Sequence, residues 1–163
     1  MKTHPAVSVY MTLRDQCFRV GSMMFTPSKK EPIPRFEYDE QWLIHPEAFA
    51  IDPEAPLTRG SHFPAQGFFK AIGDSAPDKW GRSIMLRREK RLSEKEGRKP
   101  RTLFEYDYLL GVADLTRMGG IRFTVGDSDK FVTPLEDGGV PAMIALQRLY
   151  EAASRIESCL LYT

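Results

Sequence analysis

The chain has 163 residues, of which 42% are hydrophobic and 28% are charged, so it is long enough to bury a core and is neither a disordered tail nor a membrane protein. Its formal net charge of +1 argues against a globally basic nucleic-acid binder, although a local basic patch is compatible with it. Two distant cysteines, no apolar run near the roughly 18 residues of a membrane span and no apolar signal core predict a cytoplasmic protein without a membrane segment.

The N-terminal part of the chain predicts strands. Apolar and polar residues alternate on both sides of the polar stretch 14–16, which predicts an antiparallel hairpin. We expect one face to be shared by Val7, Val9, Met11 and Leu13, and another by Phe18, Val20 and Met24. The proline-rich stretch 26–34 predicts a loop, and 35–39 predicts a third short strand.

The stretch that follows is mixed. It predicts a short helical turn that Pro46 closes, and then a strand fragment around Phe49 and Ile51. A second proline-rich stretch, 53–64, predicts an exposed loop.

The pattern then becomes helical, beginning with a short helix over 64–73 that Gly73 ends. Ser75, three residues before Asp78, resembles a capping box for the next helix. Pro77 suits the first turn of that helix, because its missing N–H costs nothing there. The helix is expected to run to about residue 91 and to bury Trp80, Ile84 and either Leu92 or Met85.

A second capping box, Thr102-x-x-Glu105, predicts another helix that ends at Gly111. The residues expected to line up along it are Leu103, Tyr106 and Leu110. Gly119-Gly120 then turns the chain into a strand over 121–125, and 141–157 has the pattern of an amphipathic helix.

The order of these elements predicts the fold class. Strands come first, helices follow and one strand returns late, which favours α+β over alternating βαβ units. We expect a small antiparallel sheet of about five strands with three to four helices packed on it. The predicted organisation is a single domain over 1–157 followed by a tail, 158–163.

The sequence shows no catalytic motif. It has neither a nucleophile elbow nor a glycine-rich phosphate loop, and its cysteines sit in no recognisable nucleophile context. His4, His45 and His62 lack metal-ligand spacing, so we expect surface or half-buried histidines. We therefore assign no catalytic, cofactor-binding or metal-binding residue, and no cofactor.

Residues 82–101 form a basic run, with nine lysines and arginines against three glutamates, a local excess of six positive charges. Such a run favours binding to the phosphates of DNA, RNA or a nucleotide, or to an acidic protein surface. The alternative is a solvated helix face whose arginine stems cover apolar neighbours. The residues singled out as a basic patch are Arg87, Arg88 and Arg91.

Two further stretches stand out. Asp114 and Arg117 precede the double glycine and predict a local ion pair that staples a tight turn, with Arg122 on the strand that follows. Trp80, followed by Gly81, has two interpretations: a core residue beside a close backbone approach, or a binding hot spot.

Five blocks follow one another along the chain: VGSMMF, FEYDEQWL, IDPEAPL, FFKAIGDSAPDKWGR and FEYDYLLGVADLTRMGGIRF. In this order they resemble the N-terminal region (N-terminal subdomain 1) of HipA-family serine/threonine kinase toxins of bacterial toxin–antitoxin modules. The resemblance extends over 7–157, and 141–157 is similar to the helix that leads into the family's kinase core. Gly120-Ile121 departs from the Ala-Leu that the family commonly has there.

The resemblance implies a bacterial protein of a system linked to persistence. It implies no enzymatic activity for this chain alone, because the family's ATP loop, catalytic aspartate and metal-binding acids are absent from the sequence. The implied partner is a HipA-type kinase core and/or a HipB-like helix-turn-helix antitoxin, with DNA contact only indirect. The family-motif or interface candidates are Asp74, Ser75, Pro77, Asp78, Trp80, Gly81, Arg82, Asp114, Arg117, Gly119 and Arg122.

Three alternatives stay open at this point. The chain is either a free-standing accessory subunit that docks on a kinase and modulates it, or the truncated N-terminal part of a toxin. The helix over 141–157 either mediates self-association or folds back onto the sheet. The alternative function is nucleic-acid binding through the basic run, 82–101.

Overall fold

The computed structural model describes residues 5–28, 31–117, 119–126, 128 and 130–132. Its centre is a five-stranded antiparallel sheet with the strand order β4-β3-β2-β1-β5. The strands are β1 (Val7–Leu13), β2 (Gln16–Thr26), β3 (Ile33–Tyr38), β4 (Ser61–His62) and β5 (Ile121–Val125). This sheet confirms the predicted α+β class. The predicted helix over 141–157 and the tail 158–163 lie outside the described residues.

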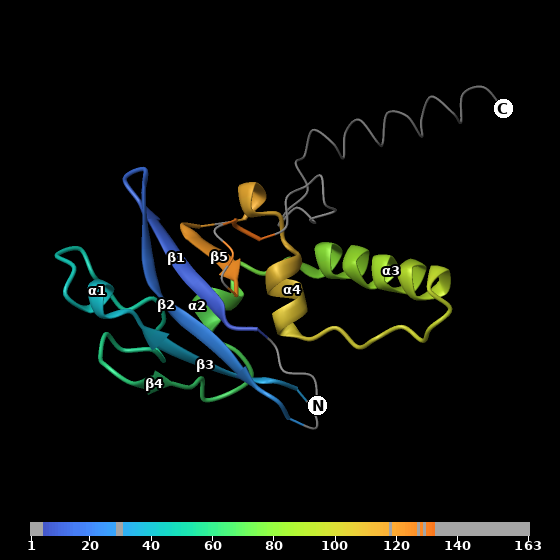
Figure 1. Ribbon diagram of the computed structural model, residues 1–163, viewed down its shortest axis with the longest axis horizontal. Coiled ribbons are helices and arrows are strands. Elements are labelled where there is room, and N and C mark those ends of the chain that lie inside the picture. Colours follow the sequence, from blue (N-terminus) through green and yellow to red (C-terminus); the bar gives the residue numbers. More distant parts are fainter. Residues whose placement is uncertain (1–4, 29–30, 118, 127, 129, 133–163) are drawn as a thin grey trace.

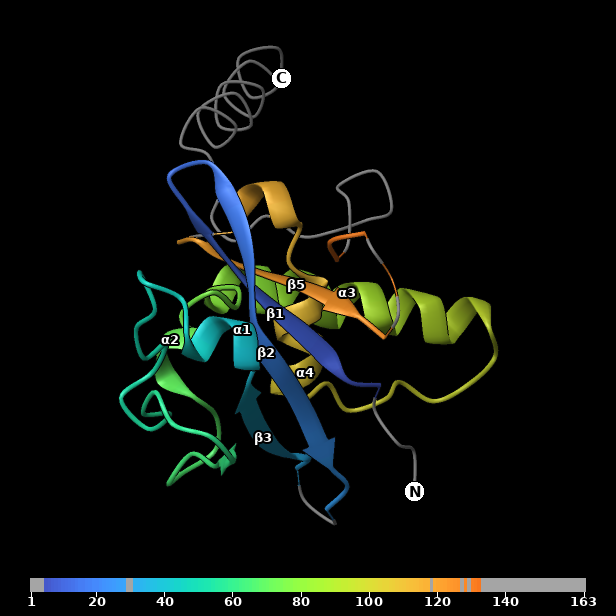
Figure 2. The same ribbon diagram turned by 60° about the vertical axis from the view of Figure 1, so that its left-hand side comes forward.

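Within the described residues, four α-helices and one 3₁₀ helix accompany the sheet: α1 (Glu40–Leu43), α2 (Lys70–Gly73), α3 (Lys79–Lys95), α4 (Glu105–Gly111) and η1 (Asp114–Thr116). In both Figure 1 and Figure 2, α3 runs past the sheet, and α4 lies beside the sheet. The two helices meet closely at Gly111, where a Cβ atom would lie 2.1 Å from Cε of Met85. The long helix therefore touches the rest of the molecule along only part of its surface.

The predicted hairpin is present, but its second strand presents a different face from the one expected. Arg14 and Asp15 both have positive φ and form the turn, as two-residue hairpins require. The register between the strands then shifts, because Val9 pairs with Gly21 whereas Tyr10 pairs with Arg19. This bulge leaves Val20 as an extra residue. It moves Met23 and Phe25 into the core and leaves Met24, predicted to face inward, half-buried.

The prediction of a strand fragment around Phe49 and Ile51 is wrong, because the structure has no strand among the described residues between β3 and β4. The hydroxyl of Tyr38 accepts a hydrogen bond from the Ile51 N–H at 3.0 Å and donates one to the Ala55 carbonyl at 2.6 Å. These bonds satisfy backbone groups that a strand partner would otherwise take. The proline-rich stretch that follows is not wholly exposed either, because Ala55 is buried and the chain forms β4 against β3.

The start of α3 differs from the predicted capping box. Asp78 is the N-cap, and its carboxylate accepts a hydrogen bond from the Gly81 N–H at 2.8 Å. Ser75 is buried and donates to the Ile72 carbonyl instead, and Pro77 lies just before the cap rather than in the first turn. The helix continues to Lys95, beyond the predicted end.

The buried side of α3 was predicted only in part: Met85, one of the two alternatives, is half-buried against Gly111 of α4, and Ile84 is half-buried. Trp80 is 40% exposed and Leu92 is 39% exposed, so neither belongs to the core. The buried residues of the helix lie on the same side as Met85, in a row of four-residue steps: Gly81, Glu89 and Ser93. The segment that follows α3 folds back along this side and places Arg98 and Arg101 on Glu89. A polar cluster thus takes the place where an apolar stripe was expected.

At α4, the predicted Thr102 cap is wrong, since the helix begins at Glu105 with Phe104 as its N-cap residue. The Phe104 N–H donates to the carboxylate of Asp107 at 3.0 Å, which satisfies one free donor of the first turn. The fully covered residues of α4 are Tyr108 and Leu109, and those predicted to line up, Leu103, Tyr106 and Leu110, are half-buried.

Candidate functional site

Arg117, one of the motif residues, contacts several elements and is only 8% exposed. Its Nη1 donates to the Ser75 carbonyl at 2.9 Å, and its Nη2 donates to the carbonyls of Leu109 and Val112 at 2.8 and 3.1 Å. Its guanidinium also lies 4.7 Å from the centre of the Phe123 ring. Arg117 therefore joins the segment before α3 to the end of α4 and to β5.

The predicted ion pair between Asp114 and Arg117 is wrong. Asp114 accepts two hydrogen bonds from Nε of Arg122, at 3.2 and 2.9 Å, and a further one from Nη2 of the same residue. Burial lowers the pKa of the Arg117 guanidinium to about 10, and the nearby carboxylate of Asp114 acts in the opposite direction. Hydrogen bonding to Asp114 raises the pKa of Arg122. The double-glycine turn is thus held by a pair that joins η1 to β5.

The guanidinium of Arg82 also donates its hydrogen bonds to other groups of the fold. Its two terminal nitrogens donate to the two carboxylate oxygens of Glu105 at 2.5 and 2.8 Å, and its Nε donates to the Pro77 carbonyl at 3.1 Å. The guanidinium lies 4.6 Å from the centre of the Tyr108 ring. The hydrogen bonds to Glu105 raise the pKa of Arg82. This fork joins α3 to α4.

The remaining motif residues lie apart from this cluster or are exposed. Asp74 is exposed at the C-terminal end of α2, and Gly119 is exposed with φ +81° at the turn into β5. Gly81 is buried, whereas Trp80 next to it is exposed on α3. The structure therefore brings together Ser75, Pro77, Asp78, Arg82, Asp114, Arg117 and Arg122 as contacts between elements, and it leaves Asp74, Trp80 and Gly119 at the surface.

Among the described residues, no group of three or more histidine, cysteine, aspartate and glutamate side chains is arranged to hold a metal ion. His45 stacks on the Trp42 ring with centroids 5.6 Å apart, and Nε2 of His62 lies 3.1 Å from the Thr58 carbonyl oxygen. None of the described helices has the length and apolar character that crossing a membrane requires.

Sequence reasoning missed two buried acids. Asp52 is 1% exposed, and its carboxylate accepts hydrogen bonds from the N–H groups of Glu54 and Ala71, so it caps α2 from a distant loop. Glu89 is 6% exposed and accepts from Nη1 of Arg98 at 2.5 Å and from the Arg101 N–H at 2.9 Å. The signal for Glu89 was its position as an acid inside a basic run.

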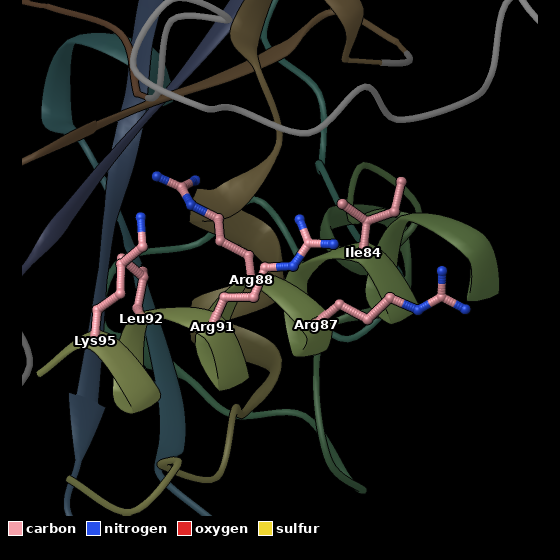
Figure 3. Close-up of a pocket in the computed structure, with 6 residues that line it drawn as sticks. All are labelled: Ile84, Arg87, Arg88, Arg91, Leu92 and Lys95. Atoms are coloured by element: carbon pink, nitrogen blue, oxygen red, sulfur yellow. The ribbon is translucent and has the colours of Figure 1, made fainter. Parts of the chain in front are cut away.

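The structure divides the basic run in two. Arg82 pairs with Glu105, whereas Arg98 and Arg101 both pair with Glu89, so these three positive charges are engaged within the fold. Among the described residues, no ion pair engages Arg87 or Arg91. These two line a shallow groove of about 380 Å³ on the outer side of α3, together with Ile84, Arg88, Leu92 and Lys95. Figure 3 shows the six side chains along this stretch of the helix.

Glu89 should make the stability of the α3 region sensitive to acid. Hydrogen bonds from Arg98 and Arg101 lower the pKa of Glu89 to about 2, against roughly 4.3 in an unfolded chain. A carboxylate with a lowered pKa stabilises the fold above the unfolded-state pKa, and this contribution is lost as the pH falls toward 2. In Glu89→Gln, the deficit in the urea unfolding midpoint should be constant above about pH 5 and should shrink between pH 5 and pH 2. Glu94→Gln, an exposed position on the same helix, is the matched control. A deficit that stays constant down to pH 2 would contradict the prediction.

Comparison with known proteins adds no assignment, since no family model and no curated protein matches this chain.

Proposed function

We propose that this chain is a non-catalytic binding component of a HipA-type toxin–antitoxin system. It binds a HipA-like serine/threonine kinase core, its helix-turn-helix antitoxin, or both, in the bacterial cytoplasm, and modulates the toxin. The proposal applies equally to an accessory subunit and to the N-terminal part of a longer toxin, because both use the same docking domain. Its starting point is the order of the five sequence blocks.

One observation carries the proposal: three charged residues of the motif blocks direct their polar atoms to other groups of the fold. Asp78 caps α3, Arg82 holds Glu105, and Arg117 binds three backbone carbonyls. A group used as acid, base or phosphate ligand has to present its polar atoms to a substrate. In this chain, polar atoms of Asp78, Arg82 and Arg117 are hydrogen-bonded within the protein instead. This supports the view that the blocks build a rigid domain to which other proteins bind.

Binding to a kinase core tests the proposal directly. The full chain is mixed with a HipA-type kinase core that lacks its own N-terminal region and, separately, with a HipB-like antitoxin, and complexes are measured by calorimetry and light scattering. We expect a stoichiometric complex with at least one of the two. An unrelated serine/threonine kinase of similar charge serves as the control. If the chain binds neither the kinase core nor the antitoxin, the proposal is contradicted.

A further inference from the structure

We infer that the groove on the outer side of α3 is the docking site for an acidic amphipathic helix of a protein partner. The inference deepens the proposed function and rests on it, because it assigns the binding of that component to a surface and to a chemistry. The groove residues are Ile84, Arg87, Arg88, Arg91, Leu92 and Lys95.

The groove combines apolar contact area with positive charge. Ile84 and Leu92 lie eight residues apart, so they are about two turns apart along the helix and about 80° apart around it, and both line the groove. Arg87, Arg91 and Lys95 follow one another at four-residue spacing along the same side. Figure 3 shows Ile84, Arg91 and Lys95 extending from α3 toward the same side. A row of cations therefore borders an apolar strip.

Among the described residues, the contacts that hold α3 to the rest of the fold lie on a different side of the helix from the groove. Glu89 receives the returning segment through Arg98 and Arg101, and Met85 packs at Gly111 of α4. A second cavity of about 330 Å³ lies between α3 and α4. It shares Arg88 and Leu92 with the first, so the recessed surface continues from the free side of α3 toward α4.

This geometry fits an acidic helix better than a nucleic acid. A helix that lies along α3 can place glutamates or aspartates one turn apart opposite Arg87, Arg91 and Lys95, while its apolar residues contact Ile84 and Leu92. A phosphate backbone gains from the cations but gains nothing from exposed aliphatic side chains. Trp80, 40% exposed, lies along the same side of the helix and extends the apolar strip.

The test uses the full chain and a synthetic peptide of about 20 residues, long enough to form a helix, with leucines on one face and glutamates at four-residue spacing beside them. A peptide of the same composition in scrambled order is the control, and a single-stranded and a duplex oligonucleotide are parallel probes. Fluorescence anisotropy should show binding of the patterned peptide and not of the scrambled one. Absence of peptide binding, or equal binding of both peptides, would overturn the inference.

Matched charge reversals locate the surface. Arg87→Glu with Arg91→Glu should weaken peptide binding about 10-fold or more, because both cations border the groove. Lys70→Glu with Lys130→Glu makes the same change in net charge at exposed positions outside α3 and the groove, and should leave affinity within about 2-fold. Equal losses in the two double variants would show a general charge effect and would overturn the assignment of the groove.

Two further measurements separate the remaining outcomes. Ile84→Ala with Leu92→Ala should weaken peptide binding about 10-fold, whereas unchanged binding would remove the apolar part of the inference. Oligonucleotide binding tighter than peptide binding, falling steeply with salt and lost in the Arg87/Arg91 variant, would replace the acidic helix by nucleic acid. If a kinase or antitoxin complex forms and survives that variant, the groove is wrong while the proposed function stands. If the peptide binds through the groove but neither protein does, the partner class is right and the toxin–antitoxin assignment fails.

Discussion

Replacing Arg117 with methionine is expected to lower the free energy of unfolding by about 3 kcal/mol, because it leaves buried acceptors without a donor. Arg117 is 8% exposed, and the carbonyls of Ser75, Leu109 and Val112 accept its hydrogen bonds. Methionine fills much of the same space and removes a buried charge, but it supplies no N–H group. An unpaired buried acceptor costs about 1–3 kcal/mol, so the loss of three partners outweighs the relief of desolvation.

Urea unfolding of the full chain measures this effect, with Arg59→Met as the matched control. Arg59 pairs with Glu40 at the surface, where the two side chains are 77% and 79% exposed, so its loss should change stability by less than about 0.5 kcal/mol. Arg117→Lys should be nearly as unstable as Arg117→Met, because an ammonium group cannot reach three carbonyls in two elements with the geometry of a guanidinium. If Arg117→Met unfolds at the same urea concentration as Arg59→Met, the bonds to the carbonyls do not stabilise the fold.

Arg117 also shows where sequence reasoning reached its limit. The short spacing between Asp114 and Arg117 predicts a local ion pair that staples a tight turn, and the sequence offers Arg122 only as a residue on the next strand. In the structure, Arg122 on β5 pairs with Asp114, and Arg117 turns toward the segment before α3, more than 40 residues away in sequence. The choice between two arginines for one carboxylate depends on tertiary packing, which local spacing does not contain.

The elements themselves were easier to predict, because alternation and order along the chain are local properties. The hairpin, the strand over 121–125 and the α+β class follow from such patterns and are confirmed. The candidate groove was partly predicted, since the basic run pointed to Arg87, Arg88 and Arg91. Its apolar part was not, because Trp80 and Ile84 were expected to be buried and Leu92 was one of two candidates for the same buried side. Only the return of 98–101 onto Glu89 shows which side of α3 is covered.

Replacing Gly21 with alanine is expected to be at least as damaging as the loss of Arg117. Gly21 lies on β2 just after the bulge, paired with Val9 on one side and with Tyr38 on the other. A Cβ atom there would lie 2.2 Å from the Glu37 carbonyl oxygen and 2.7 Å from Cζ of Phe36. Neither neighbour can move away cheaply, because the carbonyl belongs to the backbone of β3 and the Phe36 ring is fully buried.

β2 and β3 must therefore separate locally in Gly21→Ala, and we expect a loss of about 3–4 kcal/mol in the free energy of unfolding, at the upper end of overpacking effects. Gly73→Ala is the matched control, because its Cβ atom would meet only Cδ1 of Phe68 at 3.7 Å, an ordinary contact. At that helical position alanine should be neutral or stabilising by up to about 1 kcal/mol. Equal unfolding midpoints for the two alanine variants would show that the β2–β3 pairing yields more easily than the geometry implies. A large difference would show that the sheet has no room for an added side chain next to the bulge. That bulge also sets which face of β2 enters the core.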